Sequence, residues 1–104
     1  MNQITIPIIK HTHNFAENKD VAKQLRETLI IPALRDGQQV IVDFGQVSGT
    51  TQSFIHALIS GPIRKFRSIA LDNLIFKNCN TEVQSVIRIV FAYMQESADS
   101  SEIN

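Results

Sequence analysis

Apolar and polar residues follow two different periods along the chain, and this arrangement predicts alternating strands and helices. Residues 40–42 form a continuous Val-Ile-Val run, which is typical of a central strand that is buried on both faces. A polar loop with two glycines follows this run, and apolar residues then recur at helical spacing over residues 51–60. A strand, a loop and a helix start are therefore expected in the middle of the chain.

The N-terminal third predicts one strand and one helix. Residues 4–9 are rich in isoleucine, but Pro7 cannot donate a backbone hydrogen bond, so we expect an edge strand. A helix is expected to begin near residue 19 with Asn18 as its N-cap, and Pro32 should kink or end it after Ile31. The apolar positions that define this helix are Val21, Leu25 and Leu29.

The C-terminal half predicts a second strand and a long helix. Ser60, Gly61 and Pro62 interrupt the preceding helical pattern, and residues 63–66 could either prolong that helix past a kink or begin a new turn with Pro62 at its first position. Residues 74–76 form a short apolar run that predicts a buried strand. The last helix is expected to begin with Thr81 and Gln84 as a capping box. Its apolar positions are Val83, Val86, Ile87, Val90, Phe91 and Met94.

These elements define one small domain. A chain of 104 residues is long enough for a single hydrophobic core and too short for two compact units. We expect an α/β fold over residues 1–94, with helices packed on a small mixed sheet. Residues 95–104 are acidic, serine-rich and almost without apolar side chains, so they predict a flexible tail.

Composition disfavours some classes of binding partner and location. Ten Lys and Arg balance ten Asp and Glu, so no overall field favours binding to nucleic acid or to a membrane surface. No apolar run approaches the roughly 20 residues of a membrane-spanning helix, and the first residues lack the pattern of a signal peptide. A single cysteine excludes an intrachain disulfide framework. A cytoplasmic location is therefore expected.

The loop after the central strand is the first place to look for a site. In open α/β sheets, ligands and partners gather at the carboxyl ends of the strands, where helix N-termini also lie. We therefore predict a partner-binding loop and helix start. Its residues are Gly49, Thr50, Thr51, Gln52 and Ser53. Helix capping by these hydroxyls is the simpler interpretation, and the glycines are expected to serve turn geometry.

A nucleotide-binding loop is disfavoured, because no lysine precedes the two threonines to meet the phosphates. The tripeptide at residues 43–45 matches the metal-binding Asp-Phe-Gly of protein kinases, but the chain is too short for that fold and lacks its other motifs.

Other polar and basic groups have weaker patterns. Arg64, Lys65 and Arg67 surround an aromatic residue and would suit either a solvated helix end or contact with an anion. His11 and His13 could share a strand face and bind a metal, but no carboxylate or cysteine lies at ligand spacing, so we predict no metal site. Cys79 has no adjacent base and is expected to be a small core residue.

The order of motifs resembles the STAS-like domain family of unknown function. The resemblance covers roughly residues 15–94 and is most specific at Asp43-Phe44 with Val47, followed by residues 51–54. The chain is also similar, more distantly, to the anti-sigma factor antagonists. This resemblance implies a bacterial regulatory protein that pairs with a histidine-kinase-like ATPase or an anti-sigma factor.

The loop departs from the antagonist pattern at the positions that matter for switching. Antagonists carry an Asp-Ser pair whose serine is phosphorylated by the partner kinase, and the register from Asp43 places that pair on Thr51 and Gln52. Glutamine cannot accept a phosphate, so Ser53 is the remaining candidate phosphosite. Phe54 stands where antagonists have a small glycine, which crowds the surface that a kinase would use.

Two functions therefore remain open. The first is a non-enzymatic protein-interaction module that needs no cofactor and presents the loop and the following helix to another protein. The alternative is a small-ligand or nucleotide-binding regulatory domain that uses the same loop, with Arg64, Lys65 or Arg67 reaching an anionic group. No nucleophile, base and orienting residue can be assembled, so an enzyme is not expected. Homodimerisation is also left open.

Overall fold

The fold is built on a three-stranded parallel sheet. The computed structural model describes the backbone of residues 2–103 and the side chains up to Gln95. Strands β1 (Gln3–Pro7), β3 (Gln39–Asp43) and β5 (Leu74–Lys77) lie in the order β1-β3-β5. The predicted central strand and edge strand are confirmed, and so is the α/β class. The sheet was expected to be mixed, but both of its strand pairs are parallel, because each crossover between them contains helices.

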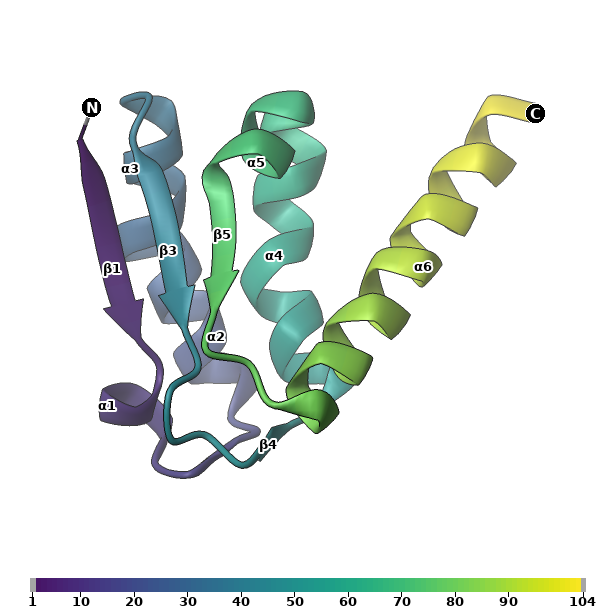
Figure 1. Ribbon diagram of the computed structural model, residues 1–104. Helices are drawn as coiled ribbons and strands as arrows, with labels where there is room; N and C mark the ends of the chain where they lie inside the picture. The colour runs from purple at the N-terminus through teal and green to yellow at the C-terminus, as the bar shows by residue number, and fades with distance from the viewer. Residues whose placement is uncertain (1, 104) are drawn as a thin grey trace.

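Helices cover one face of this sheet (Figure 1). Val40 and Val42 of β3 face them and are fully buried, whereas Ile41 between them is only half-buried. Ile41 points to the face of the sheet that the helices leave uncovered, here called the open face. Its neighbour on that face, Ile75 of β5, is 37% exposed. The prediction that the Val-Ile-Val run is buried on both faces is therefore wrong, since alternate side chains of a strand point to opposite faces and only one face is covered.

Two very short strands form a second sheet below the first. Helix α1 (Ile9–Thr12) follows β1 and leads into β2 (Phe15–Ala16), which pairs in parallel with β4 (Gly49–Thr50). Neither α1 nor β2 was predicted, because both are too short for a periodic pattern. The pair connects the N-terminal segment to the loop after β3.

The first long helix continues past its proline. Helix α2 (Lys19–Leu25) begins at Asn18, whose side-chain oxygen accepts from the amides of Asp20 and Val21, so the predicted N-cap is confirmed. A π-helical segment, η1 (Arg26–Ile30), and helix α3 (Ile31–Arg35) follow without a break. The predicted end after Ile31 is wrong, because the wider π turn accommodates the ring of Pro32.

The π-helical segment also rotates the buried face. Leu25 is buried as predicted, but Leu29 is 37% exposed and Ile30 is fully buried in its place. One extra residue in a turn advances the helix by about 100°, so every later side chain is displaced around the axis. The four-residue spacing of Val21, Leu25 and Leu29 therefore identifies the helix but misplaces its core face at the third position.

Helix α4 (Gln52–Phe66) continues through Pro62, so the alternative in which residues 63–66 prolong the helix is the one observed. It contains Gly61 and Pro62, and Pro62 is buried. Because Gly61 has no Cβ to clash with the proline ring, a helical backbone before the proline is tolerated. One turn before Gly61, the carbonyl of Ala57 accepts a hydrogen bond from Arg26 Nη1 of η1 at 3.2 Å. A short helix, α5 (Ser68–Asn73), connects α4 to β5.

The last helix, α6 (Thr81–Ile103), packs against α4 and the β4 loop and then runs out past α4 (Figure 1). Val83, Ile87 and Val90 are buried as predicted. The capping residue is Asn80 rather than Thr81, because Asn80 Oδ1 accepts from the amide of Val83 at 2.8 Å. The predicted tail, residues 95–104, coincides with the last helical turns. Most of its side chains lie outside the described part, so its flexibility stays a prediction.

Candidate functional site

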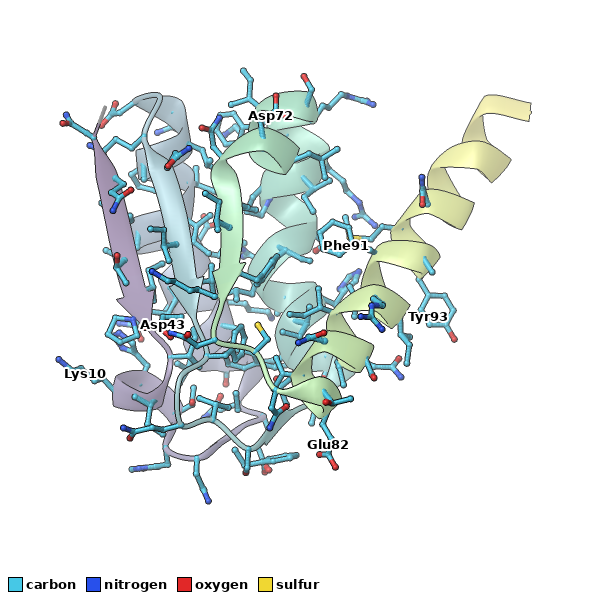
Figure 2. The ribbon with its side chains drawn as sticks, in the orientation of Figure 1. Lys10, Asp43, Asp72, Glu82, Phe91 and Tyr93 are labelled. Carbon is cyan, nitrogen blue, oxygen red and sulfur yellow. The ribbon has the colours of Figure 1, made fainter. Side chains whose placement is uncertain are left out.

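The site begins at Asp43, the last residue of β3. Its Oδ1 accepts a hydrogen bond from the amide of Gly45 at 2.8 Å and another from the side-chain amide of Asn78 at 3.0 Å. The Asn78 bond, the Gly45 bond and the nearby charge of Lys77 together hold the pKa of Asp43 below its usual range. Asp43 is therefore an anionic anchor that joins the loops after β3 and β5 (Figure 2).

The loop that follows is held at several points. The amide and the hydroxyl of Ser48 both donate to the Asn14 carbonyl, at 2.7 and 2.9 Å. Thr50 is buried, and its Oγ1 donates to the Ala16 carbonyl at 2.7 Å. Of the predicted partner-binding residues, Gly49 and Thr50 thus lie inside the β2–β4 pair. They fix the loop, and the surface that a partner could contact is smaller than the predicted loop.

Gly49 is required by close packing. A Cβ at this position would lie 2.8 Å from a ring carbon of Phe15, a separation that forces the two groups apart. Its backbone φ is not in the left-handed region, which in this loop is adopted by Gln46 at φ 67°. The expectation that the loop glycines serve turn geometry is therefore wrong for Gly49, whose missing side chain makes room for the Phe15 ring.

The three remaining predicted residues form the start of α4. Thr51 is its N-cap, and its hydroxyl oxygen accepts from the amide of Phe54 at 3.1 Å, which confirms the capping interpretation. The hydroxyl of Ser53 lies 3.3 Å from that of Thr51. Gln52 and Ser53 are exposed. The amides of a first helical turn lack intrahelical acceptors, so this end of α4 presents N–H groups and the positive end of the helix dipole.

Sequence reasoning missed Asn80, which joins the loop to α6. Its side-chain amide donates to the carbonyl of Ser48 at 2.9 Å while its Oδ1 caps α6. The acceptor is 32 residues away in sequence, so no local pattern reveals the contact. An asparagine immediately before a periodic helix is nevertheless a known N-cap preference, and that signal could have identified the cap.

A groove of about 600 Å³ lies beside the start of α4. It is bounded by Lys19 and Lys23 of α2, by Arg26 of η1, and by Val90 and Tyr93 of α6. Along its floor, α4 contributes a polar series with one alanine. These floor residues are Gln52, Ser53, His56, Ala57 and Ser60. The groove therefore includes two of the predicted site residues and adds a basic wall that the sequence analysis did not single out.

The basic cluster that was singled out lies elsewhere. Arg64 and Lys65 are in the last turn of α4, and Arg67 follows its end. A helix rises about 1.5 Å per residue, so they are roughly 18 Å along the axis from Gln52. Lys65 Nζ lies 5.9 Å from the centre of the Phe66 ring. The hypothesis that these cations reach an anion bound at the loop is therefore wrong, because the loop lies at the N-terminal end of α4 and the cations lie at its C-terminal end.

The histidines and the cysteine do not form a metal site in the part of the chain that the structure describes. His11 lies in α1 and His13 just after it at φ 69°, so they do not share a strand face. Among the described residues, no group of three or more His, Cys, Asp or Glu side chains could hold a metal ion. Cys79 is partly buried, and burial together with the charge of Asp43 raises the pKa of its thiol.

Comparison with known families agrees with this architecture. A family model described as a STAS-like domain of unknown function (DUF4325) matches residues 21–84. The chain belongs to this family, as the resemblance in its motifs predicted. The matched segment runs from the first turn of α2 to the first turn of α6 and includes the whole loop and α4. No curated protein and no solved structure matched the chain in the corresponding comparisons.

Among the described residues, no helix has both the length and the apolar composition needed to cross a membrane.

Proposed function

We propose that the chain is a non-enzymatic protein-interaction module that presents the start of α4 to a regulatory partner in the cytoplasm. The observation that carries this proposal is the contrast between Gln52 and Ser53, which are exposed, and the tightly bonded loop beneath them. A surface whose supporting backbone is already fixed loses little conformational entropy on binding, which favours recognition by a protein.

The resemblance to anti-sigma factor antagonists supports a particular class of partner. Chains of the STAS-like kind accompany histidine-kinase-like ATPase domains, so such an ATPase or an anti-sigma factor is the proposed partner. The substitution of Thr51 and Gln52 for the Asp-Ser pair supports constitutive binding, without control by phosphorylation. Ser53 is the hydroxyl that would take a phosphate if control were retained.

A matched pair of variants tests this proposal. Ser53 and Ser68 are both exposed serines in the first turn of a helix, but Ser68 belongs to α5 at the far end of α4. Calorimetric titration with the ATPase or anti-sigma protein encoded beside this chain should show at least about tenfold weaker binding for Ser53→Trp, a loss of about 1.4 kcal/mol. Ser68→Trp should bind like the wild type. Equal affinity for both variants would contradict the proposal.

The second candidate, a small-ligand or nucleotide-binding regulatory domain, is favoured by the volume of the groove. A volume of about 600 Å³ falls within the range of small-molecule sites, roughly 300–1,000 Å³. A thermal-shift screen with nucleotides tests it, because a ligand at 100 times its Kd adds about 2.7 kcal/mol of stability. No shift across the panel would count against this second candidate.

A further inference from the structure

The basic wall of the groove is a row along one side of a helix. Lys19, Lys23 and Arg26 occupy positions i, i+4 and i+7, which lie on one face and span about 10 Å along the axis. The groove that they line includes no carboxylate among its described residues. The three cations line the groove, whereas the carboxylates of the same segment, Glu17, Asp20 and Glu27, are not among its lining residues.

The three cations are not equally available. Arg26 Nε donates to Glu27 at 2.8 Å, and Arg26 Nη1 donates to the Ala57 carbonyl at 3.2 Å, so its side chain is fixed against α4. Lys19 and Lys23 are exposed, and no carboxylate among the described side chains lies within ion-pair distance of either. These two lysines therefore carry the free charge of the wall.

The opposite side of the groove has a different chemistry. Val90 of α6 is buried at its edge, and Tyr93, one turn later, is 60% exposed. Figure 2 shows Tyr93 on the side of α6 that points away from the sheet and Phe91 on the side toward it. An exposed aromatic ring beside a buried aliphatic residue is a common anchor in protein interfaces. The groove thus pairs a basic wall with an apolar edge.

We propose that this groove binds an acidic, amphipathic segment of the protein partner, with carboxylates along Lys19 and Lys23 and apolar side chains against the exposed ring of Tyr93. The inference rests on the proposed function and adds the chemistry of the partner. A row of cations spread along a helix suits several carboxylates in sequence, whereas a compact phosphate group would need cations that converge on one point. The floor residues Gln52 and Ser53 join this groove to the proposed partner-binding surface.

The test uses a defined probe. A fluorescein-labelled, helix-forming peptide with glutamates at i, i+4 and i+7 and leucines beside them is titrated with the wild-type chain, and anisotropy gives its Kd. Lys19→Glu with Lys23→Glu should weaken binding by about tenfold or more, because two attractions become repulsions. Arg64→Glu with Lys65→Glu, which makes the same charge change outside the groove, should leave the Kd unchanged. Raising NaCl from about 50 mM to about 500 mM should also weaken wild-type binding.

Three outcomes would overturn the inference. The first is equal binding of a peptide in which glutamine replaces each glutamate, and the second is equal loss in both double variants. The third is a concentration-dependent dimer, seen by sedimentation and abolished by the Lys19 and Lys23 changes, which would assign the groove to a second copy. Titration of the partner protein separates the two proposals. If Ser53→Trp weakens that complex and the lysine double variant does not, only this inference fails.

Discussion

The side-chain amide of Asn80 donates to the carbonyl of Ser48 at 2.9 Å, and this bond connects the start of α6 to the loop after β3. The same side chain caps α6 through its oxygen. Two segments more than thirty residues apart are thus fixed by one residue. The exposed start of α4 follows directly from this loop, so Asn80 contributes to the rigidity of the proposed binding surface.

Replacing Asn80 by alanine should therefore destabilise the protein by about 1 to 3 kcal/mol, the sum of a lost helix cap and a lost hydrogen bond. Urea denaturation followed by circular dichroism measures this change. Asn73→Ala is the control, because the Asn73 side chain makes one local bond to the Ile69 carbonyl and should cost less than about 0.5 kcal/mol. Equal losses in both variants would show that the connection to the loop adds nothing.

Because only one face of the sheet is covered, the same isoleucine-to-valine substitution should lower the free energy of unfolding by different amounts on the two faces. Ile6→Val removes a methylene group from a side chain that is 1% exposed and should cost about 1 kcal/mol. Ile41→Val removes the same group from the open face and should cost less than about 0.5 kcal/mol. Denaturant midpoints measured for both variants check this expectation. A larger loss at Ile41 would mean that something covers the open face.

The hydrogen bonds to Asp43 predict a pH dependence of stability. Its pKa is lowered in the folded state, so its stabilising contribution is complete above the ordinary aspartate pKa of about 4 and is lost as the pH falls through the folded value. The difference in unfolding free energy between wild type and Asp43→Asn should therefore be largest near neutral pH and should shrink in acid. Asp72→Asn, an exposed aspartate on α5, gives the background. A difference that grows in acid would have the wrong sign.

The acidic C-terminal segment should contribute little to stability. Residues 96–104 include only Ala98 and Ile103 as apolar residues, so they offer little surface to bury. A chain ending at Gln95 should melt within about 5 °C of the full chain, since 1 kcal/mol corresponds to a shift of about 4 to 8 °C in a domain of this size. A larger drop, measured by thermal denaturation, would show that this segment docks on the domain.

Strong, regular patterns in the sequence predict the fold well. The strand at the Val-Ile-Val run, the apolar series of α6 and the cap at Asn18 are confirmed because each depends on residues close together in the chain, whereas the predicted burial of both faces of that strand is wrong. The errors occur where tertiary context overrides a local rule. A π turn accommodates Pro32, so the helix does not end after Ile31. At Pro62 the sequence leaves two continuations open, and Gly61 lets α4 continue through the proline.

The candidate site could be predicted only in part. The capping role of Thr51 follows from local sequence, and the structure confirms it. The burial of Gly49 against Phe15 depends on a contact across more than thirty residues, which no spacing rule reveals. Lys19 and Lys23 resemble an ordinary solvated helix face in sequence. They become part of a groove only because α2 and α6 both pack against α4.

The loop chemistry also makes a prediction about phosphorylation. Incubation with ATP and the ATPase encoded beside this chain should leave its intact mass unchanged, because glutamine occupies the position of the phosphorylated serine in the antagonists that it resembles. A gain of one phosphate that disappears in Ser53→Ala would restore a phosphorylation switch at the start of α4.

The most direct test of the central proposal is to map the partner-binding surface. An isotope-labelled chain is titrated with the unlabelled ATPase or anti-sigma protein, and changes in backbone amide resonances are followed by NMR. The account predicts that the largest changes fall on residues 51–53 and the first turns of α4, with smaller ones along α2 at Lys19 and Lys23. Changes confined to the open face of the sheet around Ile41 and Ile75, or none at all, would contradict it.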